Sequence, residues 1–265
     1  MKTIPALSTA LLLAVGSPAP SADLATFQKA WFASTKPGSW VKYEQTSTDP
    51  EGKTRKSELT LSRLGGDGDA TWFEMRVVPK TGTRVQPMTT GTKDKPVTVK
   101  YLLKADFKVE ENALDYTKYV ETMILQPDGD DAVEYPVGAM SRVAPALATH
   151  VDYGANATSL GPCAHDGRSG EKVRIEGAFD VKVEDSQRPW ADARMKGTTE
   201  TEVCLGDSVP FGRLHEKTLT KDDKGKLKDT TEMRVLDSGS GATSAIRGPV
   251  QKWFEGPTQD APPLR

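Results

Sequence analysis

Long apolar runs and clusters of positive charge are scarce in this sequence of 265 residues. Only residues 4–15 form a nearly unbroken apolar stretch, and about 20 such residues are needed to cross a bilayer. The 35 Lys and Arg residues are interspersed with 37 Asp and Glu residues, whereas proteins that bind nucleic acid gather positive charge on one surface. The sequence therefore predicts neither an integral membrane protein nor a nucleic-acid partner.

A complete catalytic motif is also missing. Gly206-Asp207-Ser208 resembles the nucleophile block of GDSL-type hydrolases, but Val209 replaces the leucine and no downstream Asp-x-x-His follows. Without a base, a serine hydroxyl stays protonated and is a weak nucleophile. We therefore expect a turn between two strands here, and we predict no catalytic residue and no enzymatic activity.

Metal-binding patterns are incomplete in the same way. The acidic turns at residues 65–69 and 128–131 do not offer the six or more oxygen ligands that calcium prefers. The three histidines stand apart and lack the spacing of zinc ligands; they are His150, His165 and His215. We predict no metal site and no cofactor, with the histidines at the surface or at strand edges.

The N-terminus has the three parts of a secretory signal. Lys2 is followed by the apolar stretch of residues 4–15 and by small residues at 16–22, the layout of a cleaved signal peptide. Cleavage after Ala22 and cleavage after Gly16 are the two alternatives, and an uncleaved anchor is a third reading. We predict a signal peptide at residues 1–22 and a periplasmic or extracellular protein.

Cysteine occurs only twice, at Cys163 and Cys204. An even pair in an exported protein predicts one disulfide, which would stabilise the fold by about 3–4 kcal/mol in the chain-entropy account. The pair is far from C-x-x-C spacing, so a structural role is favoured over a redox role. Two free thiols are the alternative.

Period-two alternation dominates the rest of the chain. Residues 23–32 have the spacing of a short helix, and the segments after residue 40 alternate apolar and polar residues between turn sequences. We predict a mainly β protein with a large curved antiparallel sheet, a half-barrel of about ten strands, forming a single domain at residues 23–237. The expected strands begin at residue 40 and continue at 54–64, 71–78, 97–103, 119–126, 132–137, 173–183, 198–205, 213–221 and 227–236.

The tail at residues 238–265 is rich in Gly, Ser and Pro. Such a composition predicts a mostly disordered segment. Trp253-Phe254 is the exception, because two adjacent aromatic residues favour docking on the domain or on a partner.

One strand has the clearest alternation in the chain. Apolar residues take its odd positions and mostly charged residues its even ones, which indicates one buried and one solvated face. Gly177 interrupts the row and predicts a bulge or a sharp bend. The row supplies the candidate ligand-facing residues: Val173, Ile175, Phe179, Val181 and Val183.

Two stretches resemble a family of uncharacterised secreted bacterial β-proteins. Residues 170–179 (GEKVRIEGAF) and 204–212 (CLGDSVPFG) are similar to a pattern G-E-x-V-x-V-x-G-x-F followed by V-P-F-G, with Ile175 at the second valine. The order of a short helix and a long meander also resembles the LolA/LolB-like lipoprotein carriers, which implies a curved half-barrel with an apolar concave face. Neither resemblance implies catalytic positions, and V-P-F-G has an architectural reading, in which Val209-Pro210 ends a strand and Gly212 permits the turn.

Two functions remain open at this point. The first is a non-enzymatic carrier of lipid, lipoprotein or another apolar ligand. The alternative is a structural or interaction protein of the cell envelope with no small ligand, and a hydrolase comes third. The sequence indicates no ligand identity and no oligomeric state.

Overall fold

The described part of the chain folds into one open sheet of twelve strands. The computed structural model describes residues 35–67, 70–81, 95–103, 120–136, 156–183 and 193–253. The predicted signal peptide and the predicted helix at residues 23–32 lie outside these ranges. The strands are β1 (Trp40–Thr48), β2 (Thr54–Asp67), β3 (Ala70–Thr81), β4 (Val97–Leu103), β5 (Val120–Pro127), β6 (Ala132–Pro136), β7 (Asn156–His165), β8 (Arg168–Val183), β9 (Ala193–Leu205), β10 (Arg213–Asp222), β11 (Leu227–Gly239) and β12 (Val250–Lys252).

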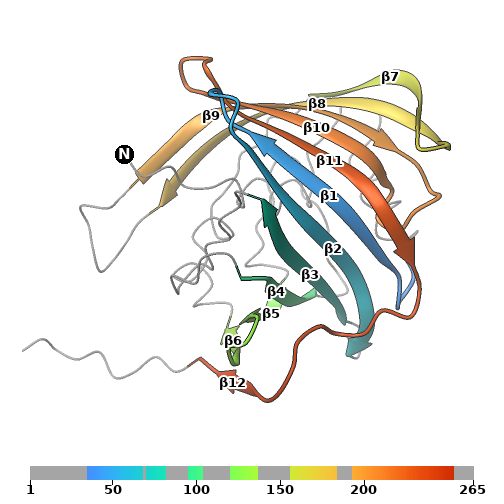
Figure 1. The fold of residues 1–265 in the computed structure, drawn as a ribbon, viewed down its shortest axis with the longest axis vertical. Coiled ribbons are helices and arrows are strands. Elements are labelled where there is room, and N and C mark those ends of the chain that lie inside the picture. The colour runs from blue at the N-terminus through green and yellow to red at the C-terminus, as the bar shows by residue number, and fades with distance from the viewer. Residues whose placement is uncertain are drawn as a thin grey trace, which may run out of the picture.

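The strand order joins the two halves of the chain edge to edge. It runs β12-β6-β5-β4-β3-β2-β1-β11-β10-β9-β8-β7, so two meanders meet where β1 pairs antiparallel with β11. Every neighbouring pair is antiparallel except β12 with β6. The sheet curls strongly, and its two ends bend toward the same side (Figure 1).

Local sequence explains the strands and their turns. In β1 every second residue is buried, which matches the alternation of a sheet with one covered face. The turn that follows is fixed by Asp49, whose carboxylate accepts hydrogen bonds from the backbone N–H of Glu51 and Lys53 at 3.1 and 2.9 Å. Gly52 has a positive φ of 80°, a conformation that glycine adopts without steric cost.

The predicted count of about ten strands was too low. All ten expected segments are strands, and β7 and β12 are added to them. β7 was missed because Gly161 and Pro162 interrupt it and its alternation is poor. The described residues contain no α-helix, and thus none that could cross a membrane.

The bulge expected at Gly177 is not found. β8 pairs with β9 in continuous register from Glu171 to Val183, with Gly177 opposite Thr199. The register shift in this region lies instead in β7, between Ser159 and Gly161. Gly161 has a φ of 94°, so the irregularity occurs where glycine allows it.

The segment that follows β11 crosses the outer face of the sheet. We call residues 240–253 the C-terminal strap. Its backbone and Ser244 bind side chains of β3 and β5, and β12 then extends the sheet beside β6, as the red segment in Figure 1 shows. Mostly disordered chain was expected from residue 238 onwards; the structure describes this part as far as Trp253, and residues 254–265 lie outside the described ranges.

Candidate functional site: the inner face of the sheet

The concave side of the sheet carries the main apolar cluster of the molecule. We call this side the inner face. Its central members come from strands in both halves of the chain and are almost fully buried, so the two meanders share one core. They include Val41, Tyr43, Leu59, Leu61, Phe73, Met75, Val99, Met123, Leu214, Met233 and Val235.

The loop between β9 and β10 closes one part of this face. Val209 and Phe211 are both 2% exposed, and the Phe211 ring meets the ring of Phe73 on β3 edge-to-face, with centroids 6.2 Å apart. The backbone N–H of Phe211 donates to the hydroxyl of Thr35 at 2.8 Å. The V-P-F-G motif therefore contributes apolar side chains to the core. Val209-Pro210 does not end a strand, because β9 already ends at Leu205, whereas Gly212, with a φ of 65°, lies in the turn directly before β10.

A hydroxyl-rich region adjoins the apolar cluster on the same face. The Thr201 and Thr218 hydroxyls are buried and lie 2.9 Å apart, and Ser47 donates to the Asp229 carboxylate at 2.6 Å. The inner face is thus amphipathic, with neutral polar groups continuing the apolar rows. The buried polar members are Gln45, Ser47, Ser57, Thr199, Thr201, Thr218 and Thr231.

Charged groups also reach the inner face. An Arg213 N–H donates to the Glu216 carboxylate at 2.8 Å, and both side chains are buried. A register shift between Arg213 and His215 explains how Arg213 reaches the same side as Glu216. Burial raises the pKa of the nearby Tyr43 phenol well above its usual value, while Arg213 lowers it and Glu216 raises it to smaller extents.

The predicted ligand-facing row lies on β8, near the edge of the sheet. Val173 and Ile175 are half-buried and pair with Val203 and Thr201 of β9, which places them beside both parts of the inner face. Phe179, Val181 and Val183 belong to the same strand, but their side chains lie outside the described set. Their role as ligand contacts stays a prediction.

The two cysteines come together at the tip of the β7–β8 hairpin. Cys163 and Cys204 are at disulfide distance, with their Cα atoms 6.0 Å apart. They lie on β7 and β9, with β8 between them, a spacing of about 9–10 Å in a flat sheet. Gly170 permits this close approach, because a Cβ there would come into steric conflict with the backbone of Leu205.

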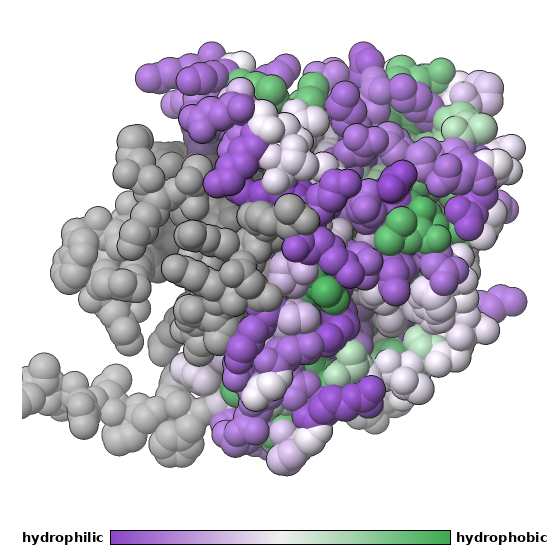
Figure 2. Space-filling model, viewed as in Figure 1, coloured by the Kyte–Doolittle hydropathy of each residue, from purple (hydrophilic) through white to green (hydrophobic). Residues whose placement is uncertain are grey.

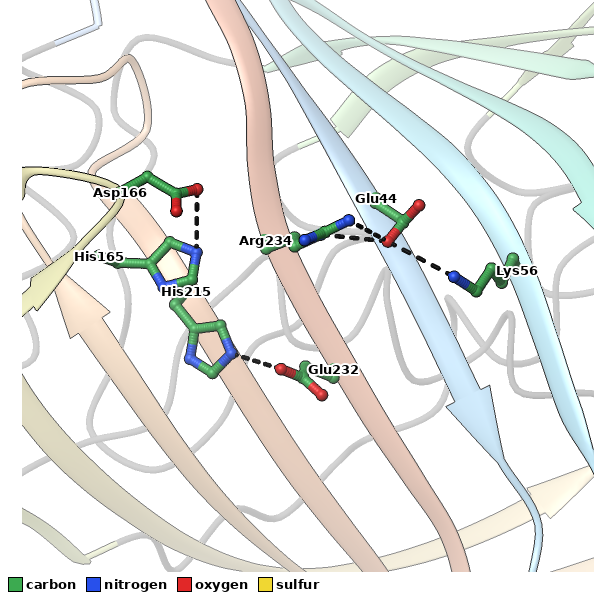
Figure 3. A network of polar contacts seen from close by, with 7 residues as sticks. All are labelled: Glu44, Lys56, His165, Asp166, His215, Glu232 and Arg234. Atoms are coloured by element: carbon green, nitrogen blue, oxygen red, sulfur yellow. Dashed lines mark hydrogen bonds and ion pairs between the residues drawn. The ribbon is translucent and has the colours of Figure 1, made fainter. Parts of the chain in front are cut away.

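Two of the three histidines also meet at this tip, which sequence reasoning missed. The His165 and His215 rings stack with centroids 4.7 Å apart, and each has an acidic neighbour, Asp166 at 3.4 Å and Glu232 at 2.8 Å (Figure 3). The sequence held only an indirect indication of this contact. The predicted Cys163–Cys204 bond brings the end of β7 next to β9, and β10 with His215 pairs with β9.

The outer face is a charged surface. On β8 and β9, Arg174 and Lys172 both contact Glu202, and the hydrogen bond from Arg174 is the main reason that the pKa of Glu202 falls to about 2. On β1, Glu44 lies between Arg234 and Lys56 (Figure 3). The described surface in Figure 2 is correspondingly mostly hydrophilic.

The acidic turn at residues 128–131 and Ser208, which were weighed as metal-binding and nucleophilic groups, have no arrangement that favours these roles. Asp128 pairs with Arg76 at 2.6 Å and Asp130 with Lys95 at 3.2 Å, so these carboxylates bind basic side chains. Ser208 is exposed in the β9–β10 loop. Among the described residues, no group of three or more His, Cys, Asp or Glu side chains is placed to hold a metal ion; His150 lies outside them.

Comparisons with known proteins give no family for the chain. No family model and no curated protein matches it. Solved structures with a similar course include LprF from Mycobacterium bovis (14% identity, 88% of this chain and 99% of that one, TM-score 0.30). Another is a hypothetical protein from Chlamydia trachomatis, with 9% identity, coverage of 84% of this chain and 96% of that one, and a TM-score of 0.36. A third is a LolA superfamily protein from Nitrosomonas europaea, with 8% identity, coverage of 83% and 94%, and a TM-score of 0.27. At these scores we base no conclusion on the likenesses.

Proposed function

We propose that this chain is an exported, non-enzymatic protein that binds a lipid or another amphipathic ligand on the inner face of its sheet. The observation that carries the proposal is the composition of that face. A large apolar cluster continues into buried hydroxyl groups and one buried ion pair on the same side. A ligand with an apolar tail and a neutral polar part is complementary to such a surface, because pockets for small molecules combine apolar lining with few polar groups.

Export forms part of the proposal. The disulfide between Cys163 and Cys204 is the kind of bond that persists in oxidising compartments, and residues 1–22 have the layout of a signal peptide. Deletion of residues 1–22 is expected to leave the protein in the cytoplasm. Normal amounts of the shortened protein outside the cytoplasm would contradict the export prediction.

Native mass spectrometry of the protein purified from its own host tests the binding proposal. The expected result is a mass adduct that organic extraction releases and that mass spectrometry of the extract identifies as a lipid. A diazirine-bearing fatty acyl probe would then map the site, with expected crosslinks on inner-face residues of β1 and β9–β11. A water-soluble diazirine serves as the control, because it should label the charged outer face instead. Absence of both an adduct and inner-face crosslinks would overturn the proposal.

A structural or interaction protein of the cell envelope, with no small ligand, is the second candidate. One observation favours it: several inner-face side chains are already buried within the chain, with Val41, Tyr43 and Leu214 at 0% exposure. A ligand would therefore have to displace covering groups, whereas a purely structural core needs no further occupant. Crosslinks from the acyl probe that are spread evenly over both faces would favour this second function.

A further inference from the structure

The Tyr43 hydroxyl is a buried donor that lacks a hydrogen-bond partner. The side chain is fully buried on β1, and its oxygen has no partner within the part of the chain that the structure describes. About nine in ten buried polar groups in proteins are hydrogen-bonded. An unpaired phenol in the middle of a core thus indicates a group that an additional molecule would satisfy.

The surroundings of Tyr43 indicate what kind of acceptor fits. Its neighbours across the strands are Leu59 on β2 and Val235 on β11, so the ring lies within the apolar cluster. The charges that act on its phenol are Arg213 and Glu216, which neutralise each other as an ion pair. These two groups leave no surplus positive charge to balance a buried anion, and a lone buried anion is strongly disfavoured.

We propose that the Tyr43 hydroxyl donates a hydrogen bond to the ester carbonyl of a neutral acyl lipid, whose acyl chains lie against the apolar cluster of the inner face. This inference rests on the proposed lipid-binding function and specifies the ligand class for the same site. A carbonyl oxygen is a good acceptor for a phenol. The ester carries no charge, and its acyl chains match Leu59 and Val235. Tyr43 is then a specificity-determining residue.

A matched pair of lipids isolates this hydrogen bond. The probes are 1,2-dioleoylglycerol, an ester, and its dioleyl diether analogue, which has similar chains and the same free hydroxyl but lacks both carbonyls. Dissociation constants are measured on the purified full chain by displacement of a fluorescent acyl probe, for the wild type, Tyr43→Phe and Tyr135→Phe. The last variant makes the same chemical change at a buried position on β6, next to Trp253, and serves as the control.

The expected result is a preference for the ester of about 3- to 10-fold in the wild type, the size of one neutral hydrogen bond. Tyr43→Phe should abolish this preference, and Tyr135→Phe should retain it. Tyr43→Phe is expected to be at least as stable as the wild type, because it removes only an unpaired hydroxyl. A clear loss of stability in that variant would show that the hydroxyl has a protein or water partner, which overturns the inference.

The failures of the two proposals are distinguishable. If the wild type binds both lipids equally and Tyr43→Phe changes nothing, the hydroxyl holds a bound water only, and lipid binding itself survives. Tighter binding of oleate anion than of the ester would overturn the neutral ligand class alone. If the wild type binds none of the three lipids, the proposed function fails together with this inference.

Discussion

One buried carboxylate contributes to the attachment of the C-terminal strap. Glu74 on β3 is 4% exposed. Its two oxygens accept hydrogen bonds from the Ser244 hydroxyl at 2.6 Å and from the backbone N–H of Ala245 at 2.8 Å. Nearby on β5, the Gln126 side chain bonds both the N–H and the C=O of Arg247, each at 2.7 Å. Glu74 and Gln126 thus hold adjacent parts of the strap.

We predict that Glu74→Ala loosens the strap and lowers the free energy of unfolding by about 3 kcal/mol, with about 6 kcal/mol as an upper bound. Hydrogen bonds to a charged group contribute about 1.5–3 kcal/mol each, but a released strap recovers hydrogen bonds to water. Glu74→Gln keeps an acceptor for Ala245 and should lose only about 1 kcal/mol.

Urea unfolding and limited proteolysis measure the two effects separately. Arg247 lies in the strap with its backbone bonded to Gln126, so trypsin cleavage after this residue reports release of the strap. Hydrogen exchange of residues 242–253 should rise in Glu74→Ala, while exchange in β8 and β9 stays unchanged. Cleavage should be slowest in the wild type, faster in Glu74→Gln and fastest in Glu74→Ala.

Glu58→Ala is the matched control. Glu58 lies on the outer face of the neighbouring strand β2 and forms an exposed ion pair with Lys80 at 3.1 Å, which contributes about 0–1 kcal/mol. The Glu58→Ala variant should leave the rate of trypsin cleavage after Arg247 unchanged. If Glu74→Ala also leaves cleavage and hydrogen exchange at wild-type levels, Glu74 does not hold the strap and the reasoning is refuted.

Three further predictions follow from other parts of the sheet. Replacing both Cys163 and Cys204 with Ser should lower the free energy of unfolding by about 3–4 kcal/mol, and denaturing, non-reducing alkylation of the wild type should label neither thiol. The pKa of Glu202 is about 2 in the folded state, below its usual 4.5, so its stabilising effect is present above pH 4.5 and is lost as the pH falls toward 2. Because the side chain is partly exposed, Glu202→Gln should remove at most about 1 kcal/mol of that pH dependence in urea melts. Phe211→Ala should cost about 3–5 kcal/mol; a loss below 1 kcal/mol would show that Phe211 is not a core residue.

Strands with regular alternation could be located from the sequence. In β1 and β2 the apolar side of each strand corresponds to the buried side. A strand has a period of two, so only one of its two orientations places the apolar side chains on the covered face. The β9–β10 loop was located by its Gly and Pro residues. Elements without alternation were missed: β7 contains Gly161-Pro162, and β12 has three exposed residues.

The polar part of the candidate site was not predictable in the same way. Charged residues are normally assigned to the solvated side, so Arg213 and Glu216 gave no sign of lying on the inner face. The register shift at the start of β10 and the partners of each residue across the sheet decide their positions. The meeting of His165 with His215 likewise depends on the curl of the β7–β8 hairpin, since the two lie 50 positions apart in the sequence.

The polar groups of the inner face lower the stability that this face could otherwise supply. An unpaired buried hydroxyl such as that of Tyr43 costs about 1–3 kcal/mol, and a buried ion pair is often no better for stability than well-packed apolar side chains. A sheet whose inner face served only as a core would be more stable with Phe at position 43 and apolar residues in place of Arg213 and Glu216. The presence of the unpaired Tyr43 hydroxyl in the apolar cluster is explained if a ligand with a neutral polar group accepts a hydrogen bond from it. Tyr43 therefore connects the lower stability of this face to the binding function that we propose for it.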